Sequence, residues 1–456
     1  MRIAHEPKQT PKICRLSPDP PPEAAINPVY SILRRLCRKM SQKRLTTLSP
    51  YATILAGRFT LVYTLGGIMQ TGQKGLSPIL KWPGGKKKEL KYIIPNLPAS
   101  IHKYYEPFVG GGAVYTAISS AKEYFINDKS NELISLYQSI SDKNRSLFFK
   151  SIEEIIHNWN ILNAVIRKNA VFFIKTYKNF SKEKTNEEKT KNKLLAFIFD
   201  NSKQFNGMFS DNFNFNTSNF LTELQTNLFR KIIRMKQIEQ KKKQLPDEDI
   251  LDNMETALKS AFYMHFRHIY NHVGEYNIDN FTKSAIFFFI RNYAYGGMFR
   301  YNSLGQFNAP YGGIQYNKNN LQKKVNYLKS DSLYHTLKNT IIDNLDFEDF
   351  FKKYKPAKND FIFLDPPYDT EFSTYTKNTF GQSDQKRLSE FLTNKCRAYW
   401  MLIIKNTDFI KQLYFNKGLE IKSFNKTYLV SFMNRNNKDA EHLLITNYNN
   451  GALYGK

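Results

Sequence analysis

The sequence predicts an α/β protein with a second region that is largely helical. In two blocks, 76–140 and 335–456, short apolar segments alternate with helical ones, a pattern typical of strands and helices that build one sheet. Between the blocks, residues 141–334 are rich in Lys and Asn and mainly helical in pattern. We therefore expect the two blocks to form one domain, and 141–334 to form a helical region with an insertion near 150–255.

The net charge indicates a polyanionic partner. A chain of 456 residues suits one catalytic domain plus a second module. Its 67 Lys and Arg against 40 Asp and Glu give a formal charge of +27. Nucleic acid is the first expectation and an anionic membrane surface the second, whereas an A+T-rich genome would explain the composition without any partner. The 36 Phe and 28 Tyr among these cations suit stacking on bases.

The first 75 residues differ from the rest of the chain. They are rich in Pro and Arg and lack periodicity, so we expect a disordered or dispensable extension, with Met69 as an alternative functional start. The apolar stretch at 59–69 is too short to span a bilayer and predicts neither a signal peptide nor a membrane helix. The three cysteines, Cys14, Cys37 and Cys396, cannot form a disulfide framework or a CxxC metal site, which indicates a reducing cytoplasm.

The segment FIFLDPPYDT at 361–370 is the strongest chemical signal. Four apolar residues predict a buried strand, and Pro366 and Pro367 end it because neither can donate to a sheet ladder. Asp365 and Tyr368 would then lie at the carboxyl edge, where α/β sheets bind ligands. A carboxylate and a Pro366 carbonyl can accept the hydrogens of an aromatic amine, and Tyr368 can stack on a base rotated out of a duplex. The alternative is a strand-ending turn with a helix-capping Asp.

The segment YYEPFVGGGAVYTAI at 104–118 predicts a strand, a turn at Gly110, Gly111 and Gly112, and then a helix. Glycines let the backbone approach a ligand closely, and the start of a helix favours a carboxylate. Such turns also bind nucleotides or serve packing alone. About twenty residues further on, the next apolar segment leads to Asp128, at a position where acidic residues bind ribose hydroxyls in nucleoside-binding folds. Capping of the following helix explains Asp128 equally well.

The segment LKWPGGKKKEL at 80–90 precedes the first predicted strand. Trp82 could flank a cofactor, Gly84 and Gly85 allow a tight turn, and Lys86 could reach a carboxylate. The alternative is a surface turn followed by solvated lysines.

In this order, the three segments resemble the Dam-like DNA adenine-N6 methyltransferases, whose WxGGK, EPFxGxG and DPPY motifs they match. Two further segments look like the DNA-contacting region of that family: YMHFRHIYN (263–271) and the hairpin-like RYNSLGQFNAPYGG (300–313). The final part of the family resembles IIDNLDFEDFF (341–351), MLIIKNTD (401–408) and EHLLITNY (441–448). The resemblance runs from about Leu80 to Tyr448, and only the insertion near 150–255 is unmatched.

The resemblance implies a Rossmann-like S-adenosylmethionine-dependent methyltransferase sheet with a largely helical target-recognition domain. It implies methyl transfer from S-adenosylmethionine to N6 of a flipped adenine in double-stranded DNA. The implied catalytic residues are Asp365, Pro366, Pro367 and Tyr368. The implied cofactor-binding residues are Trp82, Lys86, Glu106, Phe108, Gly110, Gly112, Asp128, Asp346, Phe347 and Asp365. The implied DNA-binding residues are Arg267, Arg300, Tyr301, Asn302, Leu304, Gln306 and Asn308.

Such enzymes need no metal, which affects the interpretation of His265, His268 and His272. Their spacing puts them on one helix face, but we interpret them as helix-surface or DNA-backbone residues rather than as a metal cluster. The family resemblance also implies a cytoplasmic monomer. Any cognate restriction endonuclease would act separately.

Two alternatives to a DNA adenine methyltransferase stay open. An RNA or cytosine-N4 methyltransferase could use the same geometry, although cytosine enzymes more often carry Ser at the position of Asp365 and an RNA enzyme has no reason to contain the hairpin. The second alternative is a DNA-binding module that no longer catalyses. Loss of Asp365 or of the glycines would favour it, and both are intact.

The hairpin departs from the family at one informative position. GATC-methylating members carry an arginine shortly after the Tyr-Asn pair, and arginine suits bidentate contact with guanine. This chain has Leu304 there, which cannot donate hydrogen bonds to a base, with Gln306 two residues later. We therefore expect a target that contains adenine, is not plain GATC and is read partly by the insertion.

Overall fold

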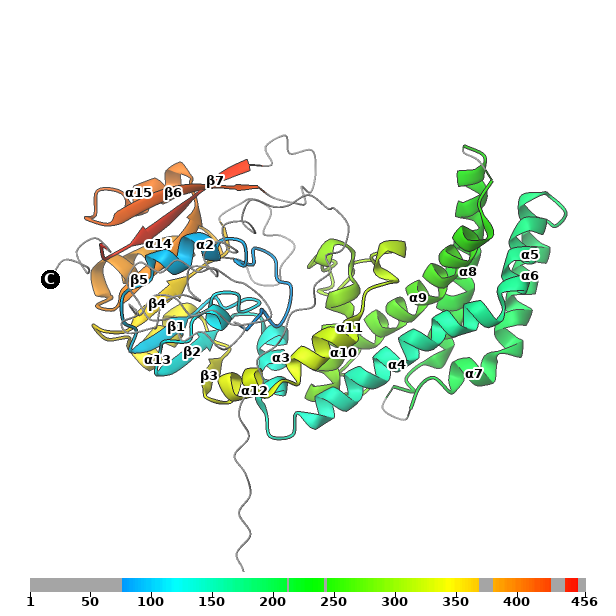
Figure 1. The fold of residues 1–456 in the computed structure, drawn as a ribbon, viewed down its shortest axis with the longest axis horizontal. Coiled ribbons are helices and arrows are strands. Elements are labelled where there is room, and N and C mark those ends of the chain that lie inside the picture. Colours follow the sequence, from blue (N-terminus) through cyan, green and yellow to red (C-terminus); the bar gives the residue numbers. More distant parts are fainter. Residues whose placement is uncertain (1–75, 211–212, 242–243, 369–379, 428–438, 450–456) are drawn as a thin grey trace, which may run out of the picture. The chain divides into compact units, whose positions relative to one another are not determined.

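A computed structural model describes residues 76–449 apart from 211–212, 242–243, 369–379 and 428–438 (Figure 1). Contacts divide the chain into two units, Met1–Met69 and Gln70–Lys456. The predictions for the N-terminal extension, for Met69 as a start, and for Cys14 and Cys37 concern residues outside the described part. Within that part, no helix is long and apolar enough to cross a membrane.

A seven-stranded, mostly parallel sheet organises the two outer blocks and confirms the predicted α/β class. Its spatial order is β3-β2-β1-β4-β5-β7-β6. The strands are β1 (Lys103–Glu106), β2 (Glu123–Asn127), β3 (Thr340–Asp343), β4 (Phe361–Leu364), β5 (Tyr399–Lys405), β6 (Glu420–Thr427) and β7 (Asp439–Thr446). β1 to β5 pair in parallel, and β7 runs antiparallel to both of its neighbours.

The strand order reverses between β1 and β4, because β2 and β3 extend the sheet in one direction and β5 in the other. In open α/β sheets, the crevice beyond the carboxyl ends at such a point binds ligands. The carboxyl ends of β1, β2 and β4 therefore mark where a site is expected.

Both faces of the sheet are buried, which explains why β4 is apolar throughout. Alternate residues point to opposite faces, so Phe361 and Phe363 pack into one core and Ile362 and Leu364 into the other. The second core also contains residues of α13 (Phe347–Tyr354), α14 (Gln382–Glu390) and α15 (Asp408–Tyr414). The first core contains residues of α2 (Leu90–Ile93) and α3 (Asn131–Ser141), and it continues into the helical region.

The helix predicted after the glycine turn is wrong. Between β1 and β2 the described chain forms only a three-residue 3-10 helix, η2 (Tyr115–Ala117). Val114, Tyr115 and Ile118 are all buried, so the apolar residues that suggested a helix face anchor an irregular connection instead. No helix dipole therefore points at a ligand from this turn.

Residues 141–334 are mainly helical, as their pattern predicts. The helices are α4 (Ser146–Lys168), α5 (Ala170–Ser181), α6 (Glu187–Asp200), α7 (Ser202–Asn206), α8 (Thr217–Glu239), α9 (Asp247–Asn271), α10 (Asn280–Tyr293), α11 (Leu321–Leu328) and α12 (Asp331–Lys338). α4, α9 and α10 lie side by side and contact one another (Figure 1). Trp159 of α4 joins them through ring contacts with Phe262 at 5.9 Å and Phe289 at 5.4 Å. α10 also packs on α3, where Ser139 Oγ donates to Ser284 Oγ at 2.9 Å.

Candidate active site

Asp365 and Tyr368 follow β4 directly, and Lys86 lies against both. Lys86 Nζ forms an ion pair with Asp365 and donates hydrogen bonds to Tyr368 Oη at 3.0 Å and to the Gly84 carbonyl at 3.1 Å. The Lys86 side chain is 2% exposed and that of Asp365 is 19% exposed. The interpretation of Lys86 as a solvated surface lysine is therefore wrong, because its ammonium is buried and held by three oxygens.

The ring of Tyr368 is also fixed by a residue that sequence reasoning did not identify. His442 of β7 is fully buried, and its ring lies edge-on to Tyr368 with the centroids 5.3 Å apart. Lys86 Nζ is 5.5 Å from the Tyr368 ring centroid. Pro366 is buried and Pro367 exposed, so the diproline step turns the chain out of the sheet and leaves Tyr368 between β7 and Lys86.

Packing within the protein explains the glycines after β1. Gly110 has φ +50°, and a Cβ there would lie 2.8 Å from Cδ1 of Trp82. A Cβ on Gly111 would lie 2.3 Å from the Leu80 carbonyl oxygen. Trp82 thus packs directly on the glycine turn, and the segments at 80–90 and 104–118 form one structural unit.

Asp128 holds the same turn from the end of β2. Its Oδ2 accepts a hydrogen bond from Gly110 N at 2.9 Å, and its Oδ1 accepts one from Ser130 N at 2.9 Å. The interpretation of Asp128 as the cap of the next helix is wrong, because Ser130 caps α3 by accepting from Leu133 N. Burial raises the pKa of Asp128 to about 6, and the charge of Asp365 contributes, while the backbone N–H donors act in the opposite direction.

Asn127 joins the loops that follow three strands, and sequence reasoning missed it. Its Nδ2 donates to the carbonyls of Pro107 and Leu345, each at 3.0 Å, and its Oδ1 accepts from Leu345 N at 2.7 Å. The side chain is 1% exposed. The only signal in the sequence was a polar residue at the end of a buried strand, next to Asp128.

Glu106 adds a third carboxyl group at the end of β1. It is 2% exposed and accepts a hydrogen bond from Tyr104 Oη at 2.6 Å. Burial raises its pKa well above the usual value, and the charges of Asp365 and Asp128 raise it further. The carboxyls of Glu106, Asp128 and Asp365 thus influence one another electrostatically, with Lys86 as a paired cation. A ligand with hydroxyl or amine donors and positive charge fits such an arrangement.

An aromatic cluster lies at the start of α13, next to Asp346. Phe108, Phe347 and Phe380 form a triangle with ring centroids 5.4 to 5.9 Å apart. Asp346 caps α13 beside them by accepting from Glu348 N. Partial burial alone would raise the pKa of Asp346, but hydrogen bonds from the Arg387 guanidinium hold it below its usual value. Phe380 was not identified from sequence, because it stands in no motif.

The candidate DNA-binding residues gather in one loop, 294–317, and on the helix beneath it. The pairing of Tyr301 with Phe307 supports its hairpin-like shape. Arg300 Nε donates to Asn308 Oδ1 at 2.8 Å, Asn302 Nδ2 donates to Gln306 Oε1 at 3.0 Å, and Arg267 of α9 donates to the Ala309 carbonyl at 3.2 Å. These polar groups shape the loop from within. Leu304 at its tip is 79% exposed.

The histidines of α9 behave differently from one another. His265 is fully buried, so its interpretation as a surface residue is wrong; burial, then nearby His268, lowers its pKa to about 3. The rings of His268 and His272 lie 4.1 Å apart. In the described part of the chain, no three His, Cys, Asp or Glu side chains gather as a metal site.

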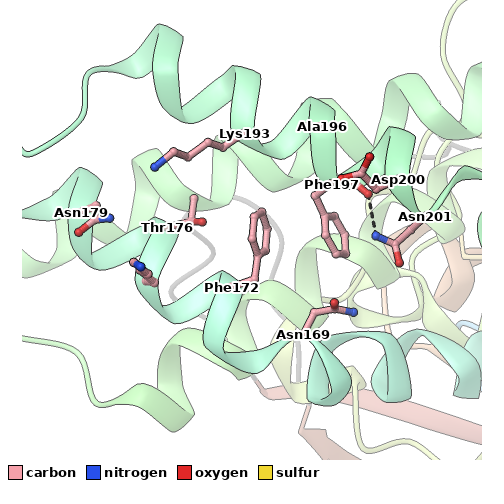
Figure 2. Close-up of a pocket in the computed structure, with 10 residues that line it drawn as sticks. Asn169, Phe172, Thr176, Asn179, Lys193, Ala196, Phe197, Asp200 and Asn201 are labelled. Atoms are coloured by element: carbon pink, nitrogen blue, oxygen red, sulfur yellow. Dashed lines mark hydrogen bonds between the residues drawn. The ribbon is translucent and has the colours of Figure 1, made fainter.

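A separate cleft of about 490 Å³ lies between α5 and α6 (Figure 2). It is lined by Phe172, Phe197, Asn179, Lys193 and neighbouring polar residues. None of the residues predicted for catalysis or cofactor binding lines it. The chemistry is therefore expected at the carboxyl ends of the strands rather than in this cleft.

The fold and this site define the class of α/β methyltransferases, with a DPPY segment at the end of a central parallel strand. A family model for the D12 class N6 adenine-specific DNA methyltransferases matches residues 82–255 and 225–429. The chain belongs to this family and is an adenine-specific DNA methyltransferase. Methyltransferases of this kind generally use S-adenosylmethionine, and DNA is the substrate.

Named relatives agree with the family assignment. The chain is 25% identical over 381 residues to the Type II methyltransferase M.CviBI of Paramecium bursaria Chlorella virus NC1A, covering 82% of this chain and all of that protein. It is 24% identical to the Type II methyltransferase M.MjaIII of Methanocaldococcus jannaschii, over 82% of this chain and 99% of the relative. A shorter match, 28% over 36% of this chain and 54% of the relative, is to the retron Ec67 DNA adenine methylase of Escherichia coli.

Proposed function

We propose that the crevice beyond β1, β2 and β4 binds S-adenosylmethionine and presents it to a flipped adenine at Asp365. The observation that carries this proposal is the position of Glu106, Asp128 and Asp365 at the carboxyl ends of neighbouring strands, close enough for Asp365 to act on the charge of both other carboxyls, with the buried Lys86 ammonium paired to Asp365. S-adenosylmethionine supplies an electrophilic methyl group on a sulfonium, and also carries an ammonium and ribose hydroxyls. Carboxyl groups accept those donors and favour the positive charge, so the residues present fit this cofactor.

Each predicted cofactor residue has a role that its position supports. Asp128, at the end of β2, would accept from the ribose. Phe108 and Phe347, beside Asp346, offer apolar faces for the adenine ring. Trp82 and Gly110, which pack on each other, would form with Gly112 the wall against which the methionine part lies. Lys86 and Glu106 would complete the charge balance of that end.

Asp365 and the Pro366 carbonyl would act on the target amine. The nitrogen lone pair of N6 is delocalised into the adenine ring, so the amine must become more tetrahedral before it can attack a methyl carbon. Acceptors for its two N–H bonds stabilise that geometry and the positive charge that develops on nitrogen. Because Lys86 is paired with Asp365 before substrate arrives, the amine must share or replace this ammonium. Tyr368, held against His442, would stack on the flipped base.

We also propose that 141–334 is the target-recognition domain and that the insertion near 150–255 supports loop 294–317, which would contact the bases. Residues along one stripe of α9 hold loop 294–317 in place through hydrogen bonds. The stripe consists of Asp252, Thr256, Lys259, Tyr263, Arg267 and Asn271, spaced three or four residues apart, and its partners are Asn317, Ala309 and Phe307. The first turns of α9, up to residue 255, fall in the segment predicted as an insertion, so that segment would help set the position of the loop.

A basic face on α8 would extend the contact with DNA. Arg230 and Arg234 are exposed, and Lys231 lies between them. Within the described ranges, no carboxylate pairs with any of the three. Burial, and then the charge of Arg234, lowers the pKa of Lys231, as expected where two cations lie close together. α8 packs along α9, where Ser260 Oγ donates to Asn227 Oδ1 at 2.9 Å, so phosphates lying over loop 294–317 could continue along α8.

The test of the proposed function is product identification. The protein is incubated with methyl-labelled S-adenosylmethionine and with duplex DNA or RNA in separate reactions, and the labelled nucleoside is identified. The proposal expects N6-methyladenine in DNA only. A labelled N4-methylcytosine, or label in RNA alone, would contradict it.

Salt dependence tests the basic face. Arg230→Gln with Arg234→Gln should lower the slope of log affinity against log salt by about 2 for duplex DNA, since each phosphate contact contributes about 0.9. Lys189→Gln with Lys191→Gln on α6 removes the same charge elsewhere and should leave the slope near that of the wild type. Equal changes in both variants would show a general effect of net charge. Because relatives are named Type II methyltransferases, we further propose that the enzyme acts beside a separate endonuclease. The monomeric state that the family resemblance implies is part of the same proposal.

A further inference from the structure

Arg291 of α10 is buried without a carboxylate partner among the described residues. Its side chain is 3% exposed, and its guanidinium donates to the carbonyls of Met298 at 2.5 Å and Gly297 at 3.0 Å. The guanidinium carbon lies 3.5 Å from the ring centroid of Phe299. A buried arginine compensated only by carbonyl dipoles and aromatic rings is costly, so an apolar residue would fill a solely structural role at a lower cost in stability.

This arrangement holds the start of loop 294–317 in a left-handed turn that glycine adopts readily. Gly296 and Gly297 both have positive φ, at 61° and 66°. Arg291 fixes the carbonyls of Gly297 and Met298 by hydrogen bonds. Because Met298 directly precedes Phe299, these bonds determine where the Phe299 ring points. Phe299 is followed immediately by Arg300, the first residue of the hairpin-like segment.

Phe299 in turn packs on Trp82. The two ring centroids are 4.4 Å apart with an interplanar angle of 65°, and the Arg291 guanidinium is 5.8 Å from the Trp82 ring. Trp82 packs on Gly110, where even a single methyl group would lie 2.8 Å from the indole. Gly110 N donates to Asp128. An unbroken series of contacts therefore runs from the DNA loop through Phe299 and Trp82 to the glycine turn.

We propose that Arg291 and Phe299 are positioning residues that couple DNA recognition to cofactor binding through Trp82. This inference rests on the proposed function, since it takes Trp82 and Gly110 to line the cofactor site. DNA that shifts loop 294–317 moves Phe299, and close packing transmits that shift to Trp82 and the glycine turn. Coupling of this kind is reciprocal, so the cofactor raises DNA affinity by the same factor by which DNA raises cofactor affinity.

The test is a binding cycle on the full chain with S-adenosylhomocysteine as an unreactive probe. Its dissociation constant is measured by calorimetry with and without a duplex that carries the target site, for wild type, Phe299→Ala and Phe299→Tyr. Wild type should show a coupling factor within the usual range of roughly 5- to 150-fold. Phe299→Ala should bring the factor close to 1, and Phe299→Tyr, which keeps the ring, should preserve it. Arg291→Lys, which keeps the charge but loses the planar stack, should reduce it.

Phe215→Ala is the matched control, because Phe215 is a half-buried phenylalanine stacked on Tyr276 in the helical region, away from Trp82. It should lower thermal stability without altering the coupling factor. The inference would be overturned if Phe299→Ala kept the coupling factor of the wild type, or if the wild type itself showed a factor of 1. Either result would leave the proposed cofactor site intact. A wild-type protein that does not bind the probe at all would instead overturn the proposed function, and this inference with it.

Discussion

Cofactor affinity should fall as the solution becomes more acidic than about pH 6, because Asp128 must be ionised to accept ribose hydroxyls. Burial raises the pKa of this carboxyl from 3.8 to about 6. At pH 7 it is mostly ionised, and at pH 5 about one molecule in ten is. The association constant for S-adenosylhomocysteine should therefore drop about tenfold from pH 7 to pH 5, or about 1.4 kcal/mol. The ligand itself does not titrate there, since an α-amino group has a pKa near 8.

The assay is isothermal titration calorimetry with S-adenosylhomocysteine at several pH values between 5 and 8. Asp128→Asn should bind weakly at every pH and lose the dependence between pH 5 and 7, which separates Asp128 from Glu106. An affinity that does not change between pH 5 and 7 in wild type, or an unchanged slope in Asp128→Asn, would refute the reasoning.

The same shift has the opposite effect on the unliganded fold. Because the folded chain binds the Asp128 proton more tightly than the unfolded chain does, the contribution of this group to the free energy of unfolding is complete below about pH 4 and is lost as the pH rises through about 6. After allowance for solvent at this partly exposed carboxyl, the loss is on the order of 1 to 2 kcal/mol. Acid should thus weaken ligand binding while it stabilises this part of the apoprotein.

Three further predictions concern the base, the target and the start of the chain. Tyr368→Ala should lower the methylation rate on duplex DNA by the equivalent of about 1 to 3 kcal/mol of lost stacking; unchanged single-turnover kinetics would count against the stacking role. Because Leu304 is exposed where a guanine-reading arginine would be needed, the methylated site should not be plain GATC. Modification-sensitive sequencing of DNA from an expressing host without adenine methylation would disprove this if every GATC, and nothing else, were modified. A chain that begins at Met69 should remain soluble and active in methyl-transfer assays, and an insoluble or inactive product would show that the extension belongs to the fold.

The local chemistry was predictable because it depends on neighbouring residues. An apolar run followed by Asp365 and two prolines already specifies a buried strand that ends in a carboxylate. Asp128, placed after an apolar segment, was likewise expected at a strand end. What each carboxylate would do as a ligand followed from the resemblance.

The partners of these residues could not be read from the sequence, since they come from distant segments. Asn127 and Leu345 are separated by 218 residues, and Lys86 and Tyr368 by 282. Contacts of this kind leave no local periodicity, and the burial of His442 against Tyr368 is a similar case. The helix expected after Gly112 failed for another reason: apolar residues at helical spacing fit a buried irregular loop equally well, and only packing decides between them.

The central claim is that Asp365 accepts the target amine in a site that methylates adenine in DNA. The most direct measurement compares wild type with Asp365→Ala in single-turnover reactions with labelled S-adenosylmethionine and duplex DNA, with the product nucleoside identified and DNA affinity measured in parallel. The account predicts N6-methyladenine from wild type, and no detectable transfer from a folded Asp365→Ala protein that still binds DNA. Near-wild-type transfer by that variant would contradict it.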